Sequence, residues 1–179
     1  MSDRLIWLDG TIYTITRSTR DTDGALLEME WQLPAGGWSP QPHVHPHLTE
    51  HYTVLDGELE LLINRSWHRL RPGDHASVDP GTVHTFRVRA APARVRNVHA
   101  PACDFEPYIR ALCATATARD LGDLSGARAL LYIALLVDEF PEHSRAAGRA
   151  LNLAAGPLAT LARLLGLRPV PAPMIGEEA

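Results

Sequence analysis

Residues 37–57 read GWSPQPHVHPHLTEHYTVLDG, and they place His43, His45 and Glu50 within eight residues. His43 and His45 are separated by one residue, so on a β-strand both side chains leave the same face. Neutral imidazole nitrogen and carboxylate oxygen are suitable ligands for Fe, Mn, Zn, Ni, Co and Cu. With Glu50, and with His84 further along the chain, these residues are candidate ligands for one divalent transition metal whose identity stays open.

Short apolar runs that end at Gly or Pro continue on both sides of this stretch. We expect a hairpin over 5–16, a loop over 17–24, and strands over 25–33, 43–45, 50–55, 58–64, 76–78, 83–88 and 93–98. Asp56-Gly57 is a strong tight-turn signal, which predicts that the two strands flanking it pair with each other. Many short strands at this rhythm favour a mainly β fold, an antiparallel barrel or sandwich consistent with a double-stranded jelly roll.

The alternation along these strands predicts where the candidate ligands point. Glu50 shares a face with Tyr52, and His84 shares one with Phe86. All four candidate ligands can therefore converge inside a barrel, each with apolar neighbours. A site of three histidines and one glutamate leaves one or two positions open on a five- or six-coordinate ion, where a small molecule could bind.

The spacing of these residues resembles the two motifs of the cupin superfamily. The first motif is matched at every fixed position, with five, one, four and six residues between Gly37, His43, His45, Glu50 and Gly57. The second motif is matched at Gly73, Gly81 and His84, whereas Asp79 stands in place of the usual Pro and Val88 in place of the usual Asn. The resemblance covers roughly residues 25–100. It implies a small single-barrel cupin, and since many cupins pair as dimers, it implies a homodimer.

Composition changes at Pro101, after which Ala, Leu and Arg dominate. We expect a cupin barrel with N-terminal strands over 1–100 and a C-terminal α-helical extension over 101–179. The expected helices are 107–119, 125–140 and 158–165, followed by a loose tail over 171–179. The second helix is apolar nearly all round, so it must pack on the barrel or on a partner subunit.

Seven of the nine histidines lie between His43 and His84. Outside the four candidate ligands, His47 and His99 are candidates for the substrate pocket. His51 should face away from the metal, and the remaining side chains, His68, His75 and His143, should be solvated. Three aromatic residues are candidate pocket walls, with core packing as the alternative for each: Trp31, Tyr52 and Phe86.

The net charge and amino-acid composition of the whole chain restrict its possible functions. The net charge of the 179 residues is −4, which gives no reason to expect a nucleic-acid partner. All 17 basic residues are Arg, so a lysine Schiff base or lysine general base is excluded. Cys103 and Cys113 are expected as free thiols. Because residues 1–10 lack a signal-peptide pattern and the apolar run 129–137 is too short to span a bilayer, we expect a cytoplasmic protein.

Two functions fit this sequence. The first is a metal-dependent enzyme, dioxygenase-like or isomerase-like, that acts on a small oxygen-bearing molecule through the three-histidine, one-glutamate site. The alternative is a non-catalytic metal- or ligand-binding module that acts as a sensor or regulator through its helices. The helical extension, which a barrel does not need for folding, supports the alternative.

Overall fold

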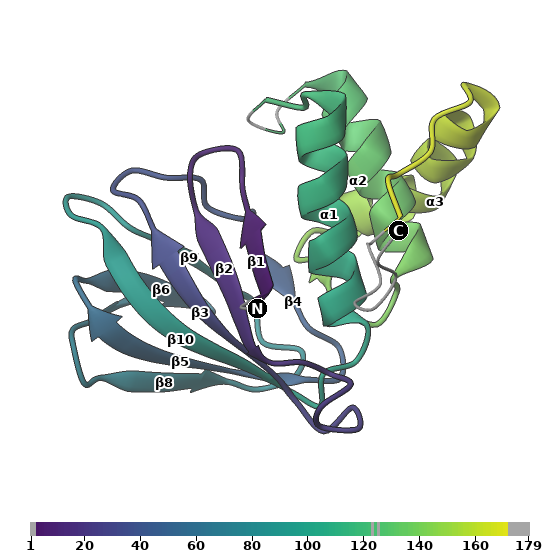
Figure 1. The fold of residues 1–179 in the computed structure, drawn as a ribbon. Coiled ribbons are helices and arrows are strands. Elements are labelled where there is room, and N and C mark those ends of the chain that lie inside the picture. The colour runs from purple at the N-terminus through teal and green to yellow at the C-terminus, as the bar shows by residue number, and fades with distance from the viewer. Residues whose placement is uncertain (1–2, 123, 125, 172–179) are drawn as a thin grey trace.

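A computed structural model describes residues 3–122, 124 and 126–171. Two antiparallel sheets face each other, and three helices stand at one end of them (Figure 1). The first sheet has the order β1 (Asp3–Ile6), β2 (Ile12–Arg17), β3 (Leu27–Leu33), β10 (Ala93–Ala100), β5 (Thr49–Asp56), β8 (His75–Val78). The second has the order β11 (Arg145–Ala146), β4 (His43–Val44), β9 (His84–Arg87), β6 (Leu59–Ile63), β7 (Ser66–Leu70). The predicted mainly β, jelly-roll fold is confirmed.

Strict alternation builds the core between the sheets. Along β3, Leu27, Met29, Trp31 and Leu33 are buried, whereas the residues between them are not. β10 pairs with β3 on one side and with β5 on the other, so it forms the centre of the first sheet. Its inward residues are buried as well, and the space between the sheets is filled by side chains.

The predicted pairing across Asp56-Gly57 is wrong. β5 pairs with β10 and β8 in the first sheet, whereas β6 pairs with β7 and β9 in the second. The turn is present, but it carries the chain from one sheet to the other. A turn signal marks where the chain reverses, and long-range packing decides which sheet receives the next strand. Gly57 has φ +73, and a Cβ there would lie 2.1 Å from the carbonyl oxygen of Pro92.

Two strands were not predicted, β7 and the two-residue β11. β7 pairs with β6 along its whole length, at the edge of the second sheet. All of its residues except Leu70 are exposed, so it lacks the apolar alternation that marks a strand with one buried face.

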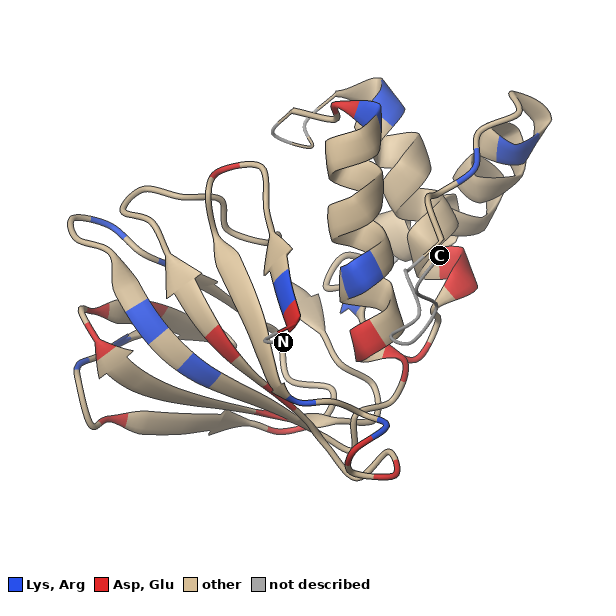
Figure 2. Ribbon diagram, viewed as in Figure 1, with Lys and Arg blue, Asp and Glu red and all other residues tan. Residues whose placement is uncertain are grey.

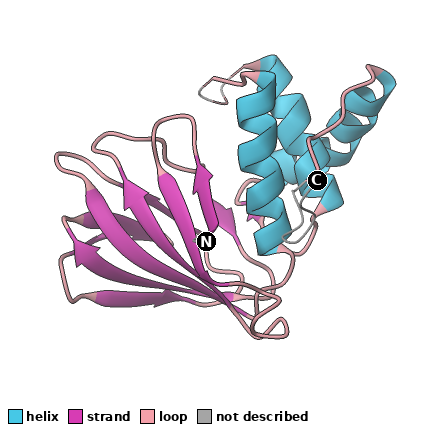
Figure 3. Ribbon diagram, viewed as in Figure 1, coloured by secondary structure: helices cyan, strands magenta, loops and turns pink. Residues whose placement is uncertain are grey.

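Three helices follow the last long strand (Figure 3). α1 (Phe105–Arg119) and α2 (Ala127–Glu139) lie within two residues of the predicted bounds. α3 (Arg149–Leu164) begins nine residues earlier than predicted, because it continues through Pro157. Pro157 costs one backbone hydrogen bond, and the packing of α3 on α2, with Ala159 and Ala162 buried, compensates for that loss. The predicted tail lies mostly outside the described residues.

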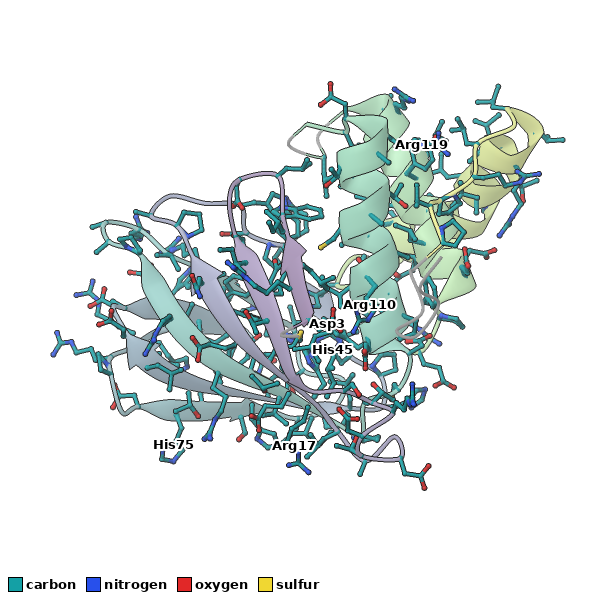
Figure 4. The ribbon with its side chains drawn as sticks, in the orientation of Figure 1. Asp3, Arg17, His45, His75, Arg110 and Arg119 are labelled. Carbon is teal, nitrogen blue, oxygen red and sulfur yellow. The ribbon has the colours of Figure 1, made fainter. Side chains whose placement is uncertain are left out.

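α1 contacts the barrel of its own chain through β1, whereas α2 packs mainly on α1 and α3. Ile109 and Cys113 of α1 belong to the same apolar core as Trp7 and Tyr13 of the barrel. Beside this contact, Arg110 is buried and pairs with Asp3 of β1 and with Glu106 (Figure 4). Both predicted free cysteines are unpaired.

The distribution of charge gives little indication of a partner. Arg and acidic residues are interspersed along the outer strands of the barrel and near the ends of the helices (Figure 2). In the part of the chain that the structure describes, no helix is long and apolar enough to cross a membrane.

Candidate metal centre

Four side chains from three strands and one loop converge inside the barrel. One of them, His45, lies at the end of the barrel that faces α1 (Figure 4). The four are His43 of β4, His45 just beyond it, Glu50 of β5 and His84 of β9. One nitrogen or oxygen from each lies within 4.8 Å of the others. His43 is directly opposite His84 in the β4–β9 pairing. His45, Glu50 and His84 are at most 3% exposed, and His43 is half-buried.

Both predicted motifs contribute to the backbone around this cluster. The N–H of Gly81 donates to the carbonyl oxygen of His45 at 2.8 Å, which joins the turn before β9 to the loop after β4. Gly81 has φ +77, so a residue without a Cβ suits this position. The departure at Asp79 leaves the turn intact, because the N–H of Thr82 donates to the Asp79 carbonyl.

Backbone carbonyls fix the tautomer of each histidine. The Nδ1 of His43 lies 2.9 Å from the carbonyl oxygen of Gln41, and that of His84 lies 2.9 Å from the carbonyl oxygen of Thr82. The Nδ1 of His45 is hydrogen-bonded to the carbonyl oxygen of His143. A carbonyl oxygen only accepts, so each Nδ1 carries the hydrogen, and each neutral ring keeps a bare lone pair on Nε2.

The Glu50 carboxylate faces these lone pairs. Its Oε2 lies 3.2 Å from Nε2 of His45 and 2.9 Å from Nε2 of His84. Its Oε1 accepts a hydrogen bond from Nδ2 of Asn97 at 2.8 Å and lies 3.3 Å from Nε2 of His99. When the three imidazoles are neutral, the Nε2 atoms and the Glu50 carboxylate oxygens are all hydrogen-bond acceptors, and no hydrogen lies between them. Such a set of acceptors needs a cation or shared protons, so these residues fit a divalent metal.

The pKa shifts of the clustered residues also indicate a site that stabilises a positive charge. Burial lowers the pKa of His43 to about 3, so this ring stays neutral. Burial opposes ionisation of Glu50, but His99, His45 and His84 together hold its pKa well below the usual range. Burial also opposes a charge on His84, yet the hydrogen bond and charge of Glu50 raise the pKa of His84. The site is thus an ionised carboxylate that stabilises a positive charge beside it.

The five residues that the sequence suggested for a substrate pocket lie in different surroundings. His99 is buried beside Glu50, and its ring stacks on Phe105 with centroids 3.8 Å apart. Burial lowers the pKa of His99. His47 is exposed in the segment after His45 and lies outside the four-residue cluster, and its place in a substrate pocket stays a prediction.

The three aromatic candidates form one packed group. Trp31 lies 6.0 Å from Tyr52 and 5.2 Å from Phe86, measured between ring centroids. All three are buried in the core between the sheets, as the core-packing alternative expects. Burial, and then the charge of Glu50, raise the pKa of Tyr52, so its phenol stays protonated beside the cluster.

The prediction for His143 is wrong. It is fully buried, and its ring stacks on Tyr108 with centroids 3.5 Å apart. Burial lowers its pKa to about 3. A histidine in a polar segment just after a helix gives no local sign of burial. Asn97 was also missed as a partner of Glu50, although its place on the inward face of a strand with His99 was a usable signal.

Comparison with known proteins agrees with this geometry. Residues 29–99 match the family model described as the cupin domain. The matched part of the barrel is a cupin domain. The matched range begins in β3, ends in β10 and includes all four clustered residues.

Two relatives of this cupin domain are informative. Over 110 residues the chain is 29% identical to quercetin 2,3-dioxygenase from Bacillus subtilis (strain 168), covering 62% of this chain and 32% of that protein. The chain therefore spans about a third of the length of this relative. The structure of KdgF from Halomonas sp. superposes with a TM-score of 0.51 at 21% identity, covering 58% of this chain and 92% of that chain. This likeness shows the fold.

Proposed function

We propose that the protein is a metal-dependent enzyme that acts on a small oxygen-bearing molecule through His43, His45, Glu50 and His84. The observation that carries the proposal is the convergence of four possible ligand atoms within 4.8 Å of one another, two of them imidazole Nε2 atoms that face Oε2 of Glu50. Of the two reaction classes that the sequence left open, the similarity to quercetin 2,3-dioxygenase supports the dioxygenase-like class over the isomerase-like class.

The residues around the site have separable roles. A bound divalent transition metal would supply a Lewis-acid centre that polarises an oxygen ligand. The three carbonyl partners hold the imidazoles with Nε2 directed inward, and the Asn97 amide holds one Glu50 oxygen so that the other faces the rings. Glu50 contributes one negative charge against the charge of the cation.

Access to the site is restricted. His45, Glu50 and His84 are nearly inaccessible, and His43 is the most exposed of the four. The stacked pair His99–Phe105 covers the side of Glu50 that faces α1. We therefore place substrate entry on the His43 side. Exclusion of water from the opposite side would strengthen electrostatic interactions at the site.

The test is turnover by metal-loaded protein. Untagged protein is stripped of metal and reconstituted separately with Fe²⁺, Mn²⁺, Co²⁺, Ni²⁺, Cu²⁺ and Zn²⁺. Oxygen consumption is then followed with quercetin and with smaller enolisable ketones. The proposal expects oxygen uptake with at least one redox-active metal, and loss of that uptake in His84→Ala with the fold intact. If no metal is retained in any preparation, the enzymatic proposal is refuted.

The second candidate, a non-catalytic sensor or regulator, also has a specific observation in its favour. The segment between α2 and α3 is hydrogen-bonded to His45 and pairs with the strand that carries His43. A metal-retaining protein whose helices change exposure on metal binding, and which lacks turnover under every condition above, would favour this function.

The assembly and location remain part of the proposal. We propose a cytoplasmic homodimer made of a barrel over 1–100 and a helical extension over 101–179. Five exposed leucines on and just after α3 support a subunit contact. They are Leu151, Leu153, Leu161, Leu164 and Leu165. Sedimentation as a monomer at micromolar concentration would refute the dimer.

A further inference from the structure

The segment that joins α2 to α3 is part of the barrel sheet. β11 lies in this segment and pairs antiparallel with β4, with Ala146 opposite His43. Just beyond the pairing, the N–H of Ala147 donates to the carbonyl oxygen of Pro42 at 3.1 Å. The backbone on both sides of His43 is therefore held by residues more than 100 positions later in the chain.

The same segment orients a second candidate ligand. The carbonyl oxygen of His143 accepts the hydrogen bond from Nδ1 of His45, and this contact is buried. The position of that carbonyl depends on packing, because the His143 ring stacks on Tyr108 of α1 and contacts the carbonyl oxygen of Phe140 at the end of α2. Of the three carbonyls that fix a tautomer in the cluster, this one alone comes from outside the sequence neighbourhood of its histidine.

α3 holds the same segment through two hydrogen bonds between Asn152 and Ala146. Nδ2 of Asn152 donates to the carbonyl oxygen of Ala146 at 2.8 Å, and the N–H of Ala146 donates to Oδ1 of Asn152 at 3.0 Å. Asn152 is exposed in the first turn of α3. A continuous series of hydrogen bonds thus leads from α3 through β11 to β4 and His43.

We propose that the helical extension is a structural part of the metal centre, so that metal binding and docking of residues 140–152 on the barrel stabilise each other. This inference rests on the proposed metal binding and goes beyond it. Coupling between two events is reciprocal: if the docked segment raises metal affinity, bound metal must favour the docked segment by the same factor. Partners that orient metal ligands change metal affinity about 10- to 100-fold when they are lost.

The proposal predicts a change in hydrogen exchange. The full-length protein is compared metal-free and saturated with Zn²⁺, a redox-inert probe, by mass spectrometry of peptides that cover 140–155. Exchange in these peptides should slow on Zn²⁺ binding by a factor comparable with the coupling, about tenfold or more. If Zn²⁺ slows exchange in β4, β5 and β9 but leaves 140–155 unchanged, the inference is overturned while the metal site stands. If Zn²⁺ does not bind at all, the proposed function fails instead.

The reciprocal experiment uses a residue far from the candidate ligands. Asn152→Ala removes both hydrogen bonds to Ala146 without touching the cluster, and should weaken Zn²⁺ binding about tenfold by isothermal titration. Thr160→Ala, at an exposed position of α3 whose hydroxyl donates to the Gly156 carbonyl of the same helix, is the matched control and should bind Zn²⁺ as the wild type does. His143→Ala, which removes the stack on Tyr108, should show a loss in the same direction. Equal Zn²⁺ affinity for Asn152→Ala, His143→Ala and wild type would overturn the inference.

Discussion

The imidazole of His45 is oriented by the backbone carbonyl of His143, which lies 98 residues further along the chain. The two residues come from parts of the chain with different composition and secondary structure, a β-barrel and a helical extension. Their contact means that the cupin domain alone does not contain every group that shapes the candidate metal centre. Truncation of the chain after β10 would remove the hydrogen-bond partner of one candidate ligand.

Replacing Glu50 with Gln should have opposite effects on the metal-free and metal-loaded protein. In the metal-free protein, the amide can donate to the Nε2 lone pairs of His45 or His84, so the unfolding midpoint should stay equal or rise. With metal, the lost negative charge should weaken binding at least about tenfold. Thermal unfolding with and without Zn²⁺ measures both effects, with Glu58→Gln on the surface as the control. A Glu50→Gln variant that gains as much from Zn²⁺ as the wild type contradicts the assignment.

Gly57→Ala should destabilise the barrel more than alanine at another left-handed glycine. Gly57 combines φ +73 with a Cβ position 2.1 Å from the Pro92 carbonyl oxygen, whereas Gly24 has φ +78 and open space around it. The left-handed conformation alone costs an alanine about 1 kcal/mol, and displacement of the Pro92 backbone adds about 1–3 kcal/mol. Urea unfolding of both variants measures the difference. Equal losses would mean that the contact with Pro92 is readily relieved.

Arg110→Leu should weaken the contact between α1 and the barrel. Arg110 is buried and pairs with Glu106, which is also buried, and with the less buried Asp3. Removing the cation leaves an uncompensated carboxylate in the interior, at a cost of about 3–5 kcal/mol. Asp3→Asn keeps a polar partner for Arg110 and should lower the free energy of unfolding less than Arg110→Leu does. The order of the two urea midpoints checks the argument, and a smaller loss for Arg110→Leu than for Asp3→Asn would contradict it.

Glu60 gives a pH-dependent prediction outside the candidate site. Hydrogen bonds from Arg89 and then Arg87 lower its pKa, with Nε atoms 2.8 and 2.5 Å from its Oε2. A carboxyl with a lowered folded-state pKa contributes stability above its unfolded pKa of about 4.5, and that stability is lost as pH falls through the folded value. The midpoint difference between wild type and Glu60→Gln should therefore be present at pH 7 and shrink below pH 4.5. A difference independent of pH would show that the ion pairs do not contribute.

The convergence of the four candidate ligands was easier to predict from the sequence than the order of the strands. His43, His45 and Glu50 lie close together in one stretch, and strand alternation places His84 on a buried face, so local rules were sufficient. The pairing of β5 and β6 was wrong because the same turn signal serves a hairpin and a crossover between sheets. Gly57 lies against the backbone of Pro92, and a contact with a residue so distant in sequence is not indicated by any local pattern.

Local sequence patterns could not predict the contacts that the helical extension makes around the site. His143 follows Pro141 in a polar segment, and its burial depends on Tyr108, 35 positions earlier. α3 was shortened in the prediction because Pro157 usually ends or kinks a helix, whereas packing against α2 maintains it. Both errors concern residues whose state is decided by partners far away in the chain.

Anomalous X-ray scattering from crystals of metal-loaded protein would show whether His43, His45, Glu50 and His84 together bind one metal ion. We expect one anomalous peak per chain, about 2.0–2.2 Å from Nε2 of the three histidines and from a Glu50 oxygen, and no such peak in His84→Ala crystals. A metal-saturated crystal without a peak at this cluster, or with the metal bound elsewhere, would contradict this expectation.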